Sequence, residues 1–174
     1  MGKKHISATE YQTLNICNWK HRLQYIDKMR PPAGPAAYFG RLIHKAMEAL
    51  IAGKPFTDEQ FEKEFKMSTV EFYNEARLPN NALFYDKLKK ELDKTHVKSM
   101  IKGGKNLLSS LREYDWNQYE TVGTEIPLDV DFIDNCSFKG YIDWIYKKDG
   151  IYYVADFKTS VKGWGKYQRN DRIK

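Results

Sequence analysis

The spacing of apolar residues changes near residue 120, and this change constrains the fold more than any other feature of the sequence. Before it, apolar residues recur every three or four positions, which is the period of a helix. After it, Ile126, Leu128, Val130 and Phe132 alternate with polar residues and a proline, which is the period of a strand. Helices followed by consecutive strands predict a mixed α/β fold in which helices flank a sheet.

Proline and glycine pairs divide the helical part, about residues 7 to 119, into five predicted helices. Ser7 or Thr9 caps the first helix, and Pro31-Pro32 ends it. Gly103-Gly104 separates the last two helices. The predicted spans are 7–29, 37–52, 57–76, 81–102 and 105–119.

Three strands are predicted over residues 121–132, 138–146 and 151–159. Asp149-Gly150, between the second and the third, is a signal for a tight hairpin turn. The aromatic and β-branched run Ile151-Tyr-Tyr-Val-Ala predicts a buried strand. An aspartate is disfavoured at the end of such a strand unless it serves a specific role there.

The length of 174 residues and the hydrophobic content of 41% predict a single domain, 1–174, with a strand-rich core over about 120–160. No run approaches the roughly 18 apolar residues of a membrane span, so no membrane partner is expected. Cys17 and Cys136 belong to no paired motif, which favours a reducing, cytoplasmic setting over a disulfide framework.

Charge is distributed unevenly along the chain. Residues 120–157 hold eight acids and three lysines, whereas residues 158–174 hold six basic residues and one acid. An acidic segment within a basic chain is informative, because cations gather carboxylates and phosphates gather lysines, but charge alone does not name a function. The net charge of +6 by itself is that of an ordinary soluble protein.

Asp143, Asp156 and Lys158 form the group of residues that suggests chemistry. On a strand, Asp156 and Lys158 point to one face, where an acid and a lysine can hold a metal ion and a phosphate together. A tight turn at Asp149-Gly150 places Asp143 beside Asp156 on the neighbouring strand. Two carboxylates that close repel each other unless a cation lies between them, and oxygen ligands suit Mg²⁺ or Mn²⁺ better than zinc.

Each candidate also has an ordinary structural explanation. Asp143 is equally expected as a solvent-facing strand residue, and Asp156 with Lys158 as an exposed ion pair. His44 lies off the apolar stripe of its predicted helix, where a histidine is ordinarily a surface residue. Gly40, one turn earlier, leaves room for something to approach the helix, and imidazole is an acceptable further ligand for a divalent ion.

Several short motifs occur in order along the chain: Gly-Arg-Leu-Ile-His44, Glu125 in the first predicted strand, Gly140-x-x-Asp143, and Asp156-Phe-Lys158-Thr159. This order resembles the RecB-like branch of the PD-(D/E)XK nucleases. That branch includes the nuclease domains of RecB and AddB, the CRISPR-associated RecB-type exonucleases and many phage nucleases. The start of the chain, from Ser7 through Cys17 to Tyr25, is similar to their N-terminal helix, and residues 57–119 would be a helical insertion.

The resemblance implies a restriction-endonuclease-like fold, with a mixed central sheet flanked by helices, and a metal-dependent deoxyribonuclease activity. Lys158 would position or help activate the attacking water and stabilise charge on the scissile phosphate. By the same resemblance, the metal ligands for Mg²⁺ or Mn²⁺ are His44, Asp143, Asp156 and the backbone carbonyl of Phe157, and the catalytic residues are Lys158, Asp156, Asp143 and Glu125.

The chain departs from the family pattern in two places. Members with an iron–sulfur cluster use one N-terminal cysteine and three more near the C-terminus. Cys17 matches the first, but the sequence lacks the downstream trio and Cys136 is misplaced, so no cluster is expected. The family's Gln-x-x-x-Tyr helix after the lysine is also missing, because Tyr167 precedes Gln168. Either the chain lacks this helix or it is a C-terminally truncated fragment.

Basic and aromatic residues are mixed in the C-terminal segment, residues 161–174. Such a mixture binds phosphates and stacks on bases, and it is equally expected of an amphipathic tail. The candidate DNA-binding residues are Lys162, Trp164, Lys166, Tyr167, Arg169 and Arg172.

These observations predict a DNA nuclease, with exonuclease as the favoured type, acting in recombination, repair or phage DNA metabolism in a bacterium or a phage-infected host. DNA is the expected partner, together with a protein of a recombination or replication complex. One alternative is a catalytically degenerate nuclease fold that binds nucleic acid or a protein; another is a metal-dependent enzyme with a different small substrate. The intact set of Asp143, Asp156 and Lys158 argues against the first, and the basic C-terminal segment against the second.

Overall fold

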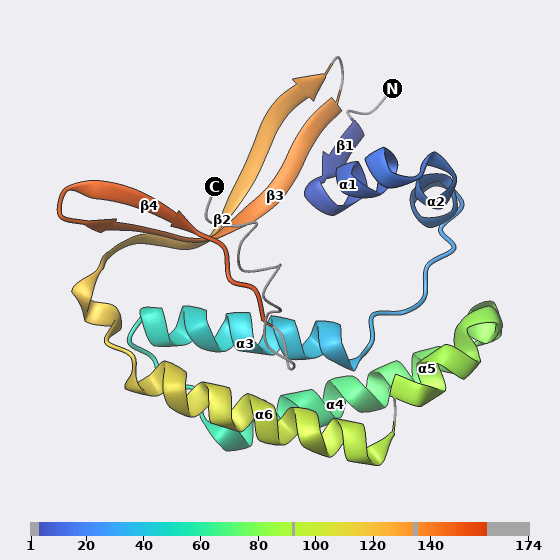
Figure 1. The fold of residues 1–174 in the computed structure, drawn as a ribbon, viewed down its shortest axis with the longest axis horizontal. Coiled ribbons are helices and arrows are strands. Elements are labelled where there is room, and N and C mark those ends of the chain that lie inside the picture. The colour runs from blue at the N-terminus through green and yellow to red at the C-terminus, as the bar shows by residue number, and fades with distance from the viewer. Residues whose placement is uncertain (1–3, 92, 134–135, 160–174) are drawn as a thin grey trace. The chain divides into compact units, whose positions relative to one another are not determined.

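The computed structural model describes residues 4–91, 93–133 and 136–159 (Figure 1). The chain packs as two compact units, each built from segments that are distant in sequence. We call Met1–Pro31 with Gln118–Asp156 the sheet unit, and Pro32–Asn117 with Phe157–Lys174 the helical unit. Among the described helices, none has both the length and the apolar character needed to cross a membrane.

A mixed sheet forms the centre of the sheet unit. Its strands are β1 (Lys4–Ser7), β2 (Glu120–Ile133), β3 (Cys136–Lys148) and β4 (Ile151–Ala155). Strand β3 pairs antiparallel with β2 along one edge, and on its other edge it pairs parallel with β1 and antiparallel with β4. Helix α1 (Ala8–Ile16) packs against β1 and β3. The predicted mixed α/β fold is therefore confirmed.

The hairpin between β3 and β4 has the tight turn that the sequence predicts. Lys148 pairs with Ile151, so Asp149 and Gly150 alone form the loop. Their φ angles of 51° and 79° are the two positive values that a type I′ turn requires, which suits Asp followed by Gly.

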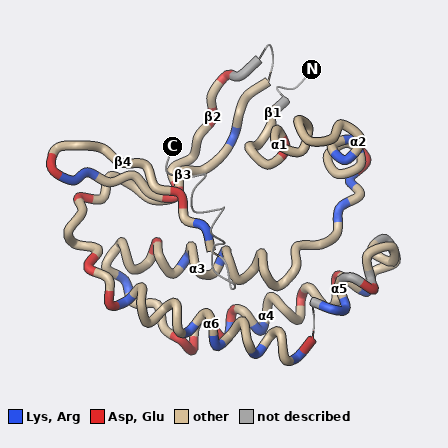
Figure 2. The backbone as a smooth tube through the Cα atoms, in the orientation of Figure 1, with Lys and Arg blue, Asp and Glu red and all other residues tan. Residues whose placement is uncertain are grey.

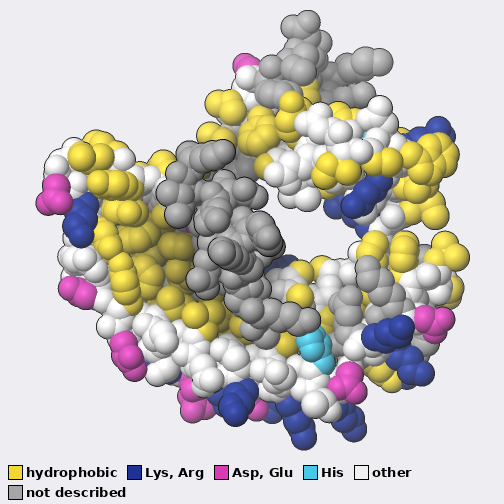
Figure 3. All heavy atoms as spheres, viewed as in Figure 1, with side chains coloured by type: hydrophobic (Ala, Val, Ile, Leu, Met, Phe, Trp, Pro, Cys, Tyr) yellow, Lys and Arg dark blue, Asp and Glu magenta, His cyan; other side chains and the backbone are white. Residues whose placement is uncertain are grey.

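Strand β4 differs from its prediction in length and in burial. It ends at Ala155, so residues 156–159 are not in a strand. Ile151, Tyr152 and Val154 are 56%, 65% and 69% exposed, and apolar side chains gather over this hairpin in Figure 3. The prediction of a buried strand was wrong because a β-branched and aromatic run marks the pleated conformation and not what covers it.

The predicted helix over residues 7–29 was also wrong in extent. Strand β1 occupies the residues before α1. The β1 residues join the sheet through backbone pairing with β3, which no local sequence pattern reveals. The Ser7 hydroxyl caps α1 as predicted, accepting a hydrogen bond from the Glu10 amide at 3.2 Å. Extended backbone at Cys17 (φ −161°, ψ 109°) then breaks the helix. The remainder is α2 (Asn18–His21) and a π-helix (Arg22–Ile26).

The helical unit is built on α3 (Pro35–Ile51), close to the span predicted for it. Proline occupies its first turn, where a missing amide proton costs nothing. Helix α4 (Asp58–Ala76) starts at the predicted cap, where the Thr57 hydroxyl accepts from the Gln60 amide at 3.1 Å. The buried core consists of Phe39, Leu42, Ile43, Ala46, Met47, Phe56, Phe61, Phe65, Met100 and Leu108.

Helix α6 (Lys94–Glu113) runs straight through Gly103 and Gly104, where the sequence predicts a break. The predicted helix before that break is instead a 3₁₀ helix (Pro79–Phe84) followed by α5 (Tyr85–Glu91). Gly104 is buried, and a Cβ atom placed on it would lie 2.2 Å from Cζ of Phe61. Its lack of a side chain therefore serves close packing of α6 on α4, not a turn.

An ion-pair network at Glu62 predicts how the helical unit responds to acid. Hydrogen bonds from Lys105 on α6 and Lys66 on α4 lower the pKa of the Glu62 carboxyl from 4.5 to about 2. A carboxyl group whose pKa is lower in the folded than in the unfolded protein stabilises the fold at pH values above the unfolded-state pKa. This stabilisation is lost as the pH falls through the folded-state pKa. We expect Glu62→Gln to be less stable than the wild type at neutral pH, and the difference to vanish between pH 4.5 and about 2.

Urea denaturation across that pH range measures this difference. Glu71→Gln is the matched control, because Glu71 is exposed on the same helix and forms no ion pair within the described ranges. High salt should reduce the Glu62 effect, since the pair is partly exposed to solvent. A Glu62→Gln deficit that persists below pH 2 would show that the network does not act through this carboxyl charge.

Candidate metal centre

The candidate site lies where β4 leaves the sheet. Along one edge of β3, β1 pairs with residues 136–139 and β4 with residues 144–148. In the described ranges no strand pairs with residues 140–143 on this edge. Asp143 is thus the last residue of β3 before the β4 ladder begins. Figure 2 shows acidic positions where β3 and β4 separate, and a basic position just after β4.

Glu125 and Asp143 face each other across β2 and β3. Thr124 pairs with Trp144 and Ile126 pairs with Ile142, so the two acids occupy the intervening opposed positions. A carboxylate oxygen of each lies within 4.8 Å of the other. Asp143 is half-buried and Glu125 is exposed. Two carboxylates at this separation repel each other in the absence of a cation, so the pair favours binding of a divalent ion.

The backbone at Glu125 is strained, which the sequence prediction of a regular strand missed. Its φ of 49° lies in the left-handed region, where a non-glycine residue is uncommon. Such outliers concentrate at functional sites. The signal in the sequence is the flanking pair Gly123 and Pro127, because both residue types interrupt regular strand pairing.

Asp156 follows directly after the last residue of β4. Ala155 pairs with Trp144 as the last pair of the β3–β4 ladder, so Asp156 and Asp143 are each the next residue beyond that pair. Asp156 is exposed and is not among the side chains that the structure groups as ligands. Because β4 ends before it, the alternation that would place Asp156 and Lys158 on one face does not apply to these residues.

The segment after Asp156 packs on α3 within the helical unit. The Phe157 ring lies against the helical core and meets the His44 ring edge to face, with the centroids 6.2 Å apart. A Cβ on Gly40 would lie 3.2 Å from the Thr159 hydroxyl oxygen. The space that Gly40 was predicted to leave on the helix therefore accommodates Thr159, while Lys158 between the two contacts is exposed.

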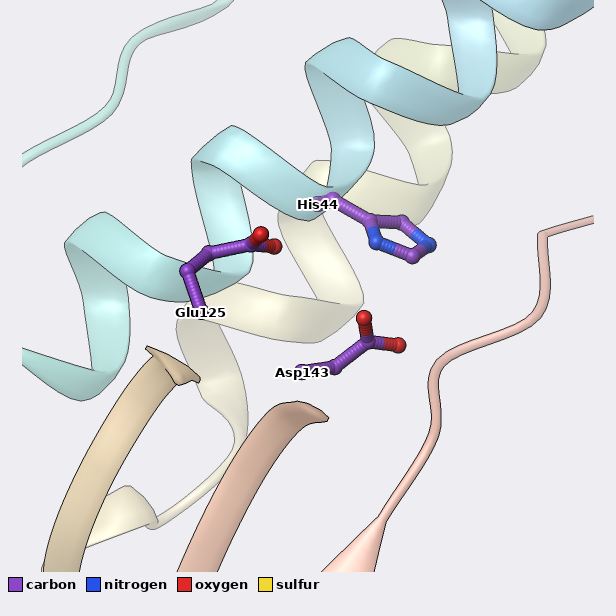
Figure 4. A group of neighbouring side chains, drawn as sticks. All are labelled: His44, Glu125 and Asp143. Atoms are coloured by element: carbon purple, nitrogen blue, oxygen red, sulfur yellow. The ribbon is translucent and has the colours of Figure 1, made fainter. Parts of the chain in front are cut away.

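His44 is half-buried on α3 in the helical unit, and Figure 4 draws it together with the two acids of the sheet unit, Glu125 and Asp143. One imidazole and two carboxylates are a donor set that could hold a divalent metal ion. Of the predicted site residues, Asp143 and Glu125 lie close together within the sheet unit, while His44 lies on α3 of the helical unit.

The predicted DNA-binding residues lie outside the described residues. These are Lys162, Trp164, Lys166, Tyr167, Arg169 and Arg172.

Comparison with protein families gives one match that spans nearly the whole chain. The model of the PD-(D/E)XK nuclease superfamily matches residues 5–170. No match is found among curated proteins or among solved structures.

Proposed function

The chain belongs to the PD-(D/E)XK nuclease superfamily, and we propose on that basis that it is a Mg²⁺- or Mn²⁺-dependent DNA exonuclease of the RecB-like branch. Membership indicates a metal-dependent nuclease, a hydrolase of phosphodiester bonds. The choice of DNA, of these two metals and of this branch is our proposal. It is supported by the order of the motifs from His44 to Lys158 and by the oxygen-rich donor set.

The observation that carries the proposal is the facing pair of Glu125 and Asp143 beside the end of β4. The pair fits a divalent cation, because the ion would remove the repulsion between two carboxylates held on neighbouring strands. When bound, such an ion supplies a water of lowered pKa and a positive charge at the phosphate. We assign the ligands to His44, Asp143, Asp156 and the Phe157 carbonyl, with Glu125 beside them.

Packing of the chain prepares two of these groups for their roles. The half-buried Phe157 ring packs on the helical core beside the His44 ring, and we infer that this contact helps to orient the Phe157 carbonyl. Lys158 follows at once, and its ammonium group would contact the scissile phosphate, orient the attacking water and stabilise the charge that develops on the phosphate oxygens. The Asp143 carboxylate would ligate the metal beside them.

The setting of this activity follows from the same resemblance. We propose that the enzyme removes nucleotides from DNA ends in recombination, repair or phage DNA metabolism, inside a bacterial cell or phage-infected host. A protein partner of a recombination or replication complex is part of this proposal.

Cleavage of linear and covalently closed circular DNA with Mg²⁺, Mn²⁺ or EDTA tests the proposal. We expect degradation of linear DNA with either metal, none with EDTA, and little cutting of closed circles. Lys158→Ala should lower the rate about a hundredfold, because it removes one stabiliser of transition-state charge. Lys139→Ala is the control, since that lysine lies on β3 and pairs with Asp129.

Two results would overturn the proposal. Binding of DNA without cleavage under either metal would support the alternative of a degenerate nuclease fold. Cleavage of RNA but not DNA would retain the superfamily chemistry and refute the assigned substrate.

A further inference from the structure

A polar cavity of about 740 Å³ lies within the sheet unit, apart from the candidate metal centre. The π-helix and the segment after it line one part of the cavity with Tyr25, Lys28 and Arg30, and β1 with the start of α1 lines another. Figure 2 shows basic positions on this segment after α2.

The cavity carries an excess of positive charge. Lys28 and Arg30 form no ion pair with any described residue. The one acid in the lining, Glu10, is already engaged, because its carboxylate lies 3.0 Å from Nε2 of His21. A single surface lysine without an acidic partner is ordinary, but two cations that share a concave surface raise the local anion concentration.

Arg30 is held in a fixed position by contacts that leave its terminal nitrogens available. Its Nε donates to the Gln24 carbonyl at 2.8 Å, and its guanidinium carbon lies 4.0 Å over the ring of Tyr25. Tyr25 in turn stacks on His21, with the ring centroids 5.2 Å apart. The two Nη groups make no hydrogen bond within the described ranges. A guanidinium fixed in this way loses little entropy when it binds an oxyanion through its fork.

The remaining lining residues indicate which anion fits. Ser7 and Thr9 add hydroxyl groups, and His5 adds an imidazole. The N-terminus of α1 is not what would attract an anion, because its Glu10 amide already donates a hydrogen bond to the Ser7 hydroxyl. Several donors around an arginine fork and a lysine suit the three or four oxygens of a phosphate better than the two of a carboxylate.

We propose that this cavity binds a phosphate group of a nucleic-acid strand. The identity of the strand as nucleic acid rests on the proposed function; the anion site itself does not. The phosphate is either a terminal monoester or a diester within the strand, and both offer the oxygens that Arg30 and Lys28 would contact.

Binding of short single-stranded oligonucleotides, labelled at the 3′ end and measured by fluorescence anisotropy in EDTA, tests the proposal without cleavage. One oligonucleotide carries a 5′ phosphate and the other a 5′ hydroxyl. The test variant is Lys28→Asn with Arg30→Gln, in which asparagine suits the positive φ of 57° at position 28. The control variant is Lys20→Gln with Lys63→Gln, which removes the same charge from two exposed positions.

We expect the test variant to bind about tenfold more weakly than the wild type and the control to change binding little. Loss of two phosphate contacts should also reduce the slope of log affinity against log salt by about 1.4. A loss confined to the 5′-phosphorylated strand assigns a terminal phosphate, and an equal loss for both strands assigns an internal one. Equal weakening in the test and control variants would overturn the proposal.

The outcome is independent of the nuclease assay. If the wild type does not cut with any metal but the test variant binds more weakly than the control variant, the proposed function fails while the phosphate site stands. If the wild type cuts DNA and the test variant binds as the wild type does, the phosphate site fails and the nuclease stands.

Discussion

Asp143→Asn should lower the rate of metal-dependent DNA cleavage about a thousandfold. The substitution keeps the size and shape of the side chain but removes the charge that faces Glu125 across β2 and β3. Without that charge the site binds a divalent ion weakly, so neither the activated water nor the positive charge at the phosphate is available. The initial rate on linear DNA at saturating Mg²⁺ measures the effect.

Asp149→Asn is the matched control for this variant. Asp149 is exposed in the β3–β4 turn at a φ of 51°, where asparagine is equally at home, so both folding and cleavage should be unchanged. Metal binding gives a second measurement: Mn²⁺ should raise the melting temperature of the wild type and not that of Asp143→Asn. Cleavage by Asp143→Asn within about tenfold of the wild type would remove Asp143 from the metal centre.

Gly104→Ala should lower the free energy of unfolding by about 2 kcal/mol, although alanine favours helices. The new Cβ would lie 2.2 Å and 2.3 Å from two ring atoms of Phe61 and 3.2 Å from Phe39. Phe61 is fully buried and stacks on Phe65, so its ring cannot move aside as the end of a flexible chain would. An overpacking cost of about 3 kcal/mol therefore outweighs a helix-propensity gain of about 1 kcal/mol.

A double-mutant cycle in urea separates this clash from other effects of the substitution. Phe61→Leu removes the ring atoms that the new Cβ would meet, so the double variant Phe61→Leu with Gly104→Ala should be more stable than the sum of the single effects. Additive effects, or a Gly104→Ala variant more stable than the wild type, would show that close packing is not why glycine stands there.

Local sequence signals were sufficient where a structure depends on neighbouring residues. Asp149-Gly150 predicts a two-residue loop, and the register of β3 and β4 follows from it. Thr57 marks the start of α4, because a capping residue acts within one turn of helix.

The same signals failed where distant residues decide the structure. Glycine at position 104 predicts a helix break from sequence alone. It is instead a site of close packing, because the ring of Phe61 on another helix lies against it. Strand β1 has no alternation of its own and exists through parallel pairing with β3. Propensity reports local preference, and tertiary contacts override it in both cases.

The candidate site shows both outcomes. Asp143 was proposed from motif order, and the structure places its carboxylate beside that of Glu125 within the sheet unit. The role of Glu125 was the least certain from the sequence, because its position depends on a left-handed backbone within β2. The roles of Asp156 and Lys158 remain predictions that the cleavage assays test.

The β3–β4 turn has a consequence for how such a chain can vary. Asp143 and Asp156 each stand five residues from the pair that closes the loop, Lys148 and Ile151. The loop can exchange its residues for others that accept positive φ, such as Asn-Gly. An insertion in one strand only would separate Ala155 from Trp144 and so shift the end of β4, where Asp156 follows, relative to Asp143. Homologous chains should therefore lengthen this hairpin only by equal additions to both strands.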